Sequence, residues 1–372
     1  MRRAGRAVVD ETPRAPTFGV EEEYLLLDAA TGLPADAAVD LIDDLDGLRA
    51  EHEFFHSQLE TATPVCSEAA DALDSLAEFR AAASAAAERR GLVLAGTGLP
   101  PIGGEIRGTV TAKDRYQQIA GRMRGMVHRY YSTGTHVHVA VPSRDAGIDA
   151  ISRIAPWSPV LVALTANSPL WLGDDSGYAS WRYLSIQQWP TSGFPPRFAD
   201  AAEYDRVVGE LVRTGALVDA ALVNWSIRLS DRFPTIEIRT ADAQLGHVDA
   251  VAFGLLFRAL VTRALREGAA GAPIAPVQPD VLRGAHWLAA RNGLGDTLAD
   301  PATGEPVPAF DGVGALLAHV ADDLLASGDH GIVTDWIERR RADGGAAELQ
   351  RSAWASGGIA GLLELFRTSS RA

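Results

Sequence analysis

The chain has 372 residues, of which 47% are hydrophobic and 22% are charged, and its formal net charge is −14. These values are typical of a globular protein. The acidic balance argues against binding to nucleic acid or to a membrane surface, because both are anionic. The only cysteine, Cys66, excludes an intramolecular disulfide and suits a reducing compartment, so we expect a cytoplasmic protein. Residues 1–16 are predicted to form a flexible tail that precedes one domain, residues 17–372.

The lysine content restricts how the chain can hold phosphate groups. Lys113 is the only lysine, and no GxxxxGK[ST] loop or GxGxxG turn between a strand and a helix is present. A phosphate site that depends on a lysine is therefore disfavoured. Any nucleotide bound here is expected to be held by metal ions and arginines.

The first predicted element is a half-buried strand at residues 19–27. Side chains two residues apart on a strand lie on the same face. Glu21 and Glu23 therefore share one face, and apolar side chains occupy the other, where Glu22 breaks the pattern. The strand predicts two carboxylates that point into a common space.

A second strand and a long helix follow. Residues 58–61 form the strand, which carries Glu60 on its polar face. Residues 67–90 have an apolar stripe with helical spacing, with Ser67 as the predicted N-cap and a glycine directly after the helix. Residues 92–95 are then predicted to be a buried strand.

A third polar strand face is predicted at residues 135–141. His136 and His138 share one face of this strand, and valines occupy the other. Residues 149–167 are predicted to be helical, with a break at their two prolines, because proline interrupts helical hydrogen bonding.

The fourth polar strand, residues 235–240, places Glu237 and Arg239 on one face. Helices and short strands are mixed without regular βαβ spacing, so the sequence predicts an α+β fold. The remaining predicted helices are residues 201–226, 247–267 and 311–325.

The polar faces of the four strands would line one cleft if the strands pair in a single sheet. Several carboxylates in one cleft repel each other and take up protons, and a divalent cation removes that penalty. Oxygen ligands with a single imidazole suit Mg²⁺, or alternatively Mn²⁺, better than a metal that prefers thiolates. Each motif alone also fits an ordinary strand edge or charge pair, so the residues by themselves name no reaction.

Four motifs occur in an order and at a spacing that resemble a known family. They are FGVEEEY at residues 18–24, LETATPVC at residues 59–66, GTHVHV at residues 134–139 and TIEIRT at residues 235–240. Together they resemble the glutamate–cysteine ligase type 2 family of bacterial carboxylate–amine ligases. The segments LTANSP at residues 164–169, GY at residues 177–178 and WR at residues 181–182 are also similar to that family.

The resemblance implies a glutamine synthetase-like catalytic fold, in which a curved antiparallel sheet with flanking helices holds ATP and metal ions on its concave face. It implies that the γ-carboxylate of L-glutamate is joined to L-cysteine or another amine through an acyl phosphate. The implied partners are small-molecule amino acid and amine substrates, with a homodimer as the candidate assembly.

The resemblance also assigns roles to individual residues. Arg239 and Glu237 are the implied catalytic residues, and Arg239, Arg115 and Arg182 would bind phosphate or a substrate carboxylate. A Glu237→Ala variant is expected to lose turnover with little loss of folding. The implied metal ligands are Glu21, Glu23, Glu53, Glu60, His136 and Glu237.

Two other functions are compatible with the same residues. A metal-dependent hydrolase would use His136, His138 and the carboxylates, with an open metal position for water. A non-catalytic relative would bind nucleotide without turnover.

Overall fold

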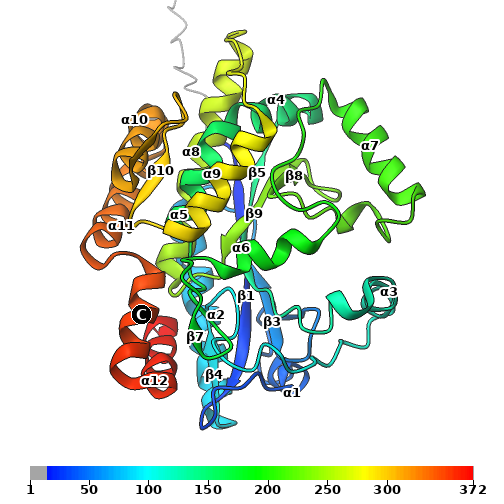
Figure 1. The fold of residues 1–372 in the computed structure, drawn as a ribbon, viewed down its shortest axis with the longest axis vertical. Helices are drawn as coiled ribbons and strands as arrows, with labels where there is room; N and C mark the ends of the chain where they lie inside the picture. The colour runs from blue at the N-terminus through cyan, green and yellow to red at the C-terminus, as the bar shows by residue number, and fades with distance from the viewer. Residues whose placement is uncertain (1–14, 372) are drawn as a thin grey trace, which may run out of the picture.

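A seven-stranded antiparallel sheet forms the centre of the computed structural model, which describes residues 15–371 (Figure 1). The strand order is β2-β3-β1-β5-β9-β8, and β4 pairs with the second half of β1. The strands are β1 (Phe18–Asp28), β2 (Glu51–His52), β3 (Gln58–Ala62), β4 (Leu92–Ala95), β5 (Gly134–Ala140), β8 (Ile227–Leu229) and β9 (Thr235–Asp242). The predicted tail lies outside the described residues, apart from its last two positions.

Twelve α-helices and two small hairpin sheets complete the described part of the chain. The helices are α1 (Ala38–Ile42), α2 (Ala69–Arg89), α3 (Asp114–Met123), α4 (Arg144–Ile154), α5 (Ser158–Leu164), α6 (Trp181–Ser185), α7 (Ala201–Arg213), α8 (His247–Ala269), α9 (Pro279–Asn292), α10 (Ala309–Ser327), α11 (His330–Asp343) and α12 (Ala346–Arg371). The hairpins are β6 (Leu170–Trp171) with β7 (Asp174–Asp175), and β10 (Thr297–Ala299) with β11 (Pro306–Pro308). The α+β prediction is confirmed.

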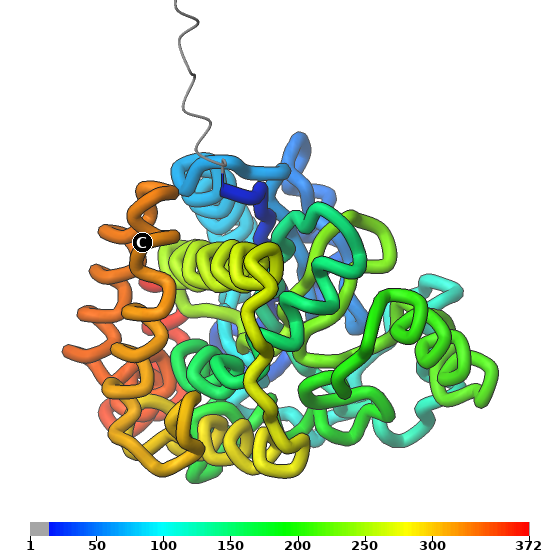
Figure 2. Tube along the Cα trace, turned by 90° about the horizontal axis from the view of Figure 1, so that it is seen from above, coloured from blue at the N-terminus to red at the C-terminus, as the bar shows by residue number. Residues whose placement is uncertain are grey.

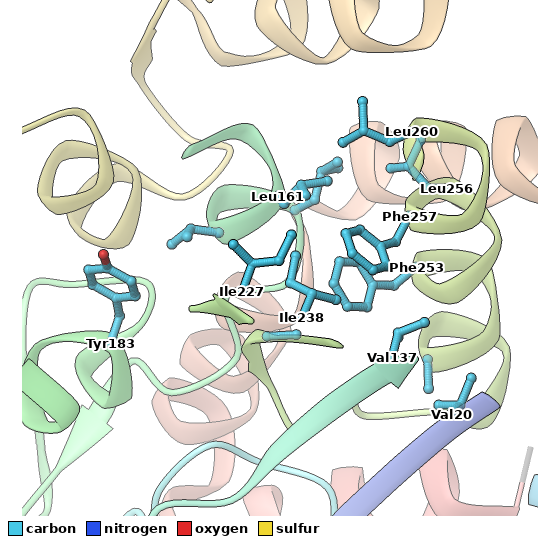
Figure 3. Close-up of a cluster of buried hydrophobic side chains, with 14 of the residues drawn as sticks. Val20, Val137, Leu161, Tyr183, Ile227, Ile238, Phe253, Leu256, Phe257 and Leu260 are labelled. Atoms are coloured by element: carbon cyan, nitrogen blue, oxygen red, sulfur yellow. The ribbon is translucent and has the colours of Figure 1, made fainter. Parts of the chain in front are cut away.

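Helix α8 covers one face of the sheet and forms the centre of the core. Its Phe253 and Phe257 pack over Val20 of β1, Val137 of β5 and Ile238 of β9, and all of these side chains are buried (Figure 3). Helices α10 and α11 pack against α8 on its outer side (Figure 2). Since the apolar strand residues face α8, the alternating polar residues face away from it, as the sequence predicts.

Several predicted helix boundaries are wrong, including the start of the helix predicted at residues 149–167, which begins at Arg144 as α4. Helix α2 begins at Ala69 with Glu68 at the N-cap position, and no side chain caps it. The Ser67 carbonyl accepts a hydrogen bond from Arg258 at 2.7 Å. Helix α7 ends at Arg213, since Gly215 takes a left-handed conformation with φ of 79°, so residues 214–226 are not part of it. The predicted break at the two prolines is confirmed, because a short 3₁₀ helix separates α4 from α5.

Glu22 breaks the alternation of β1 because it is a buried charge rather than a surface one. Its carboxylate forms an ion pair with Arg80 of α2, and both side chains are only 1% exposed. Tyr24 also donates a hydrogen bond to Glu22. Arg80 donates further to the carbonyls of Gln244 at 3.0 Å and Leu245 at 2.6 Å. The pair therefore joins the back of the sheet to α2 and to the loop after β9.

Within residues 15–371, none of the helices has the length and apolar character needed to cross a membrane.

Candidate active site

A cavity of about 450 Å³ opens on the face of the sheet that points away from α8. Its size is typical of a small-molecule binding site. Side chains from β1, β3, β5, β8 and β9 form the floor, and α3 and the loops around it contribute to the wall. The predicted site residues all line this cavity, namely Glu21, Glu23, Glu53, Glu60, Arg115, His136, Arg182, Glu237 and Arg239.

The strand register brings the acidic residues of β1 opposite their predicted neighbours. Glu23 pairs across the β1–β3 ladder with Glu60, and Glu21 pairs across the β1–β5 ladder with His136. Directly opposed residues on neighbouring strands are close enough for their side chains to interact. The prediction that the polar strand faces line one cleft is therefore confirmed.

Three carboxylates, Glu23, Glu53 and Glu60, gather at the β1–β3 end of the cavity. Burial raises the pKa of Glu23 to about 8, together with the negative charge of Glu53. Burial and the charges of Glu53, Glu21 and Glu23 likewise raise the pKa of Glu60 well above its usual value. The backbone amide of Gly134 donates to Glu23 at 2.7 Å. We call Glu23, Glu53 and Glu60 the acidic cluster.

The acidic cluster has the chemistry of a site for a hard divalent cation. Its negative charges repel each other in a buried space, and carboxylate oxygens are the ligands that Mg²⁺ prefers. Within the described residues, no three His, Cys, Asp or Glu side chains already converge as a metal cage. Mg²⁺ usually keeps several waters and takes one or two carboxylates, so it needs no such cage. The assignment of these residues as metal ligands stays a prediction.

The raised pKa of Glu23 predicts a pH-dependent stability of the metal-free protein. Between its ordinary pKa of 4.5 and about 8, Glu23 binds a proton when folded and releases it on unfolding. Stability should therefore fall as the pH rises, by about 1 kcal/mol between pH 7 and pH 8. Buried His136, whose pKa is lowered to about 4, has the opposite effect only below pH 6.5. The free energy of unfolding at pH 7 and pH 8, measured with urea in the presence of a metal chelator, tests this expectation.

A Glu23→Gln variant provides the matched control for the pH effect. The amide has the same shape but does not titrate, so its stability should change less between pH 7 and pH 8 than that of the wild type. A wild-type stability that rises over this interval would show that Glu23 is ionised in the folded protein.

Glu21 lies beside the acidic cluster, between the two histidines of β5. Its oxygens lie 3.5 Å from His136 Nδ1 and 3.3 Å from His138 Nε2. Burial opposes the ionised form, but the hydrogen bonds with the histidines outweigh it and hold the pKa of Glu21 well below its usual value. Burial and the charge of Arg239 lower the pKa of His136 to about 4, so its ring is neutral at neutral pH.

Glu237 lies between two arginines, one of which sequence reasoning missed. Arg228 of β8 donates to both of its oxygens, at 2.8 and 3.1 Å, and Arg239 donates to it as well. Burial opposes ionisation, but the charges of Arg239 and Arg228 hold the pKa of Glu237 well below its usual value. The sequence does contain a signal for Arg228, because residues 227–229, Ile-Arg-Leu, alternate as in a strand with one polar face.

Arg182 is held at the back of the cavity by a buried polar network. Its Nε donates to Ser132 Oγ at 2.8 Å, and its Nη1 lies 3.7 Å from Asp242. Asp242 in turn accepts from the backbone of Asn167 at 2.7 Å and from Ser168 Oγ at 2.8 Å. The LTANSP segment at residues 164–169 therefore supports Arg182 through Asp242 rather than lining the cavity itself.

Arg115 lies on α3 at the wall of the cavity, where it is already paired. Its Nε and Nη2 donate to the two oxygens of Asp219, at 2.8 and 3.0 Å. The pair uses two of the five N–H donors of the guanidinium, so an anion would be bound by the remaining donors or by an exchange of partners. The predicted role of Arg115 in binding an anion stays a prediction.

Two solved structures, a ligase and a synthetase, have the same fold. The crystal structure of glutamate–cysteine ligase from Francisella tularensis in complex with AMP superposes with a TM-score of 0.70 at 14% identity, covering 96% of this chain and 88% of that chain. A bifunctional glutathione synthetase from Pasteurella multocida superposes with a TM-score of 0.66 at 14% identity, covering 96% of this chain and 52% of that chain. At this identity the likeness establishes the fold.

Sequence comparison defines the family. Residues 17–354 match the model of glutamate–cysteine ligase family 2. A relative from Salinispora tropica that carries the glutamate–cysteine ligase 2 name is 40% identical over 338 residues, 90% of this chain and 89% of that protein. A second, from Frankia alni, is 40% identical over 359 residues, 92% of this chain and 93% of that protein. The chain is therefore an ATP-dependent ligase that forms a carbon–nitrogen bond. It belongs to glutamate–cysteine ligase family 2.

Proposed function

We propose that this ligase joins the γ-carboxylate of L-glutamate to L-cysteine or another small amine, with ATP and Mg²⁺, in the cytoplasm. The observation that carries the proposal is the charge arrangement of the cavity. The acidic cluster lies at the β1–β3 end of the cavity floor, Arg228 and Arg239 lie at its β8–β9 end, and β5 runs between the two groups. A metal-bound polyphosphate would complement both groups of charges. The metal would neutralise the carboxylates of the acidic cluster, and the arginines would neutralise the phosphate oxygens.

The reaction needs an activated carboxylate, because a carboxylate ion resists attack by an amine. An oxygen of the glutamate γ-carboxylate attacks the terminal phosphorus of ATP, and ADP leaves. The amine then attacks the carbonyl carbon of the acyl phosphate, phosphate leaves, and the nitrogen loses a proton. Phosphoryl transfer of this kind depends mainly on positioning and on neutralising charge. Mg²⁺, when bound, supplies part of that neutralisation.

Side chains of the cavity would supply the remaining charge neutralisation and the positioning of the reactants. Arg239 lies beside His136, with Nη1 3.5 Å from Nδ1, and also faces the charges of Glu23 and Glu21. It is therefore placed between the two halves of the cavity, where charge on a transferring phosphoryl group would develop. Glu237, held between Arg228 and Arg239, fixes the direction of the Arg239 guanidinium. Arg182 is a second cation whose charge acts on Glu23.

The test is a substrate screen in which ADP release is measured and the product is identified by mass. Release of ADP is expected only when Mg²⁺, L-glutamate and an amine are present together, and the product mass should equal donor plus amine minus water. If no amine in a broad panel gives ADP, the proposed ligation is wrong. Turnover of a substrate without ATP would instead support the metal-dependent hydrolase, and nucleotide binding without any turnover would support a non-catalytic relative.

A further inference from the structure

A buried amide near the start of the C-terminal helix α12 joins this helix to the interior. Gln350 is 1% exposed and does not line the cavity. Its Nε2 lies 2.7 Å from Asn167 Oδ1, 2.9 Å from the Asn167 carbonyl and 3.1 Å from Thr97 Oγ1. Figure 1 shows α12 and α3, which lines the cavity, at opposite sides of the molecule. Gln350 therefore connects a distant helix to the segment that leads to Arg182.

Asn167 passes this connection on to Asp242 through two contacts. The backbone amide of Asn167 donates to Asp242 Oδ2 at 2.7 Å. Its Nδ2 donates to the carbonyls of Ala243 at 2.6 Å and Gly96 at 2.9 Å. Because Nδ2 faces two carbonyls, Oδ1 is the atom that faces Gln350, which has to present its NH₂ group. The hydrogen bonds around Asn167 thus agree on a single orientation for both amides.

Asp242 and Arg182 have little room to move. Asp242 Oδ1 lies 3.7 Å from Arg182 Nη1. A Cβ atom at Gly98 would lie only 2.7 Å from the carboxyl carbon of Asp242, and a Cβ atom at Gly134 would overlap Arg182 Nη2. The backbone therefore encloses both side chains, so a displacement of the Asp242 carboxylate would be transmitted to the guanidinium that lines the cavity.

We propose that Gln350 is a positioning residue for Arg182 and acts through Asn167 and Asp242. This inference rests on the proposed function, in which the Arg182 guanidinium binds an anionic group of a substrate. A guanidinium donates in a fixed plane, so its direction decides whether it meets that group. Supporting hydrogen bonds outside the cavity keep such a side chain in its productive geometry. Loss of the Gln350 amide leaves Asn167 Oδ1 buried and unpaired, and the support of Arg182 relaxes.

The test is a double-mutant cycle between Gln350→Leu and Arg182→Ala. It is measured on kcat, on the KM of each substrate, and on the Kd of Mg²⁺–ADP and of L-glutamate by titration calorimetry. Gln350→Leu fills a similar space without hydrogen bonds and is expected to lower kcat/KM roughly tenfold. The KM that rises should belong to the same substrate as in Arg182→Ala. In the Arg182→Ala background, Gln350→Leu should add less than about twofold, because the group that Gln350 positions is absent.

Ser370→Ala is the matched control, because Ser370 is also a buried polar residue of α12. Its Oγ donates to the carbonyl of Leu94 on β4 at 3.1 Å, outside the connection to Arg182. This variant should leave kcat, KM and both Kd values unchanged. If Gln350→Leu does not fold, Thr97→Val tests the same connection, because it keeps the side-chain shape and removes one acceptor of the Gln350 amide. It should change the same KM in the same direction.

Additive effects of Gln350→Leu and Arg182→Ala would overturn the proposal, because they would show that Gln350 acts on the fold and not through Arg182. Equal kinetic losses in Gln350→Leu and Ser370→Ala would overturn it as well, and in both cases the proposed ligation would stand. If no amine is ligated but the Kd values show the expected coupling, the ligation is wrong and the positioning role stands. A wild-type protein that binds neither probe contradicts both.

Discussion

Replacing Arg239 with alanine is expected to lower kcat by about 10²–10³-fold, because one fixed donor of charge to the transition state is lost. The fold should tolerate the change, since Arg239 is 24% exposed and Glu237 keeps its two hydrogen bonds with Arg228. The measurement is ADP release at saturating substrates, combined with thermal unfolding of the same preparation.

Arg228→Ala is the matched control, because Arg228 binds the same carboxylate but has a different second role. Its Nη1 donates to the carbonyls of Ala221 at 2.8 Å and Val223 at 2.6 Å, so it also holds the loop before β8. This variant should lose about 3 kcal/mol of unfolding free energy. Its kcat should fall less than that of Arg239→Ala. Equal losses of kcat in the two variants would contradict a specific role for Arg239 in phosphoryl transfer.

The same geometry changes what is expected of Glu237→Ala. Sequence reasoning expects lost turnover with little loss of folding. The structure places Glu237 in the interior between two guanidinium groups, and its removal leaves both without their carboxylate. Unpaired buried charge is strongly destabilising. The variant is therefore expected to lose stability as well, and its kinetics alone would not isolate a catalytic role.

Replacing Arg80 with alanine is expected to have the largest effect on stability, about 3–5 kcal/mol, although Arg80 does not line the cavity. The change leaves the Glu22 carboxylate buried without its cation and removes two donors to backbone carbonyls. Chemical unfolding measures the loss, with the linear extrapolation to zero denaturant.

A double variant, Glu22→Gln with Arg80→Met, separates charge from packing. It removes both charges together and keeps side chains of comparable length, so it should be more stable than Arg80→Ala alone, because no uncompensated charge remains. An Arg80→Ala protein whose unfolding free energy lies within about 1 kcal/mol of the wild type would show that the pair contributes little.

Much of the site could be predicted from strand periodicity. The alternation in β1, β5 and β9 correctly places Glu21, Glu23, His136 and Glu237 on the face away from the core. Alternation predicts which face of a strand a side chain occupies, and these four side chains all line the cavity.

Partners across the sheet could not be predicted in the same way. The two-arginine setting of Glu237 depends on the register between β8 and β9, which brings Arg228 opposite it. The partner of Glu22 lies 58 residues away on a helix. Pairings of this kind follow from how elements pack in three dimensions, which a single sequence does not state.

The run Glu21-Glu22-Glu23 on β1 also fixes how that strand can align with its neighbours. A shift of one residue would exchange the two faces of the strand. Glu22 would then point into the cavity, and Glu21 and Glu23 would both enter the apolar layer, where Arg80 is the cation that already serves one carboxylate. At least one charge would be buried without a partner, so the slipped alignment is excluded energetically. The ion pair of Glu22 with Arg80 therefore favours the one strand alignment in which Glu21 and Glu23 face the cavity.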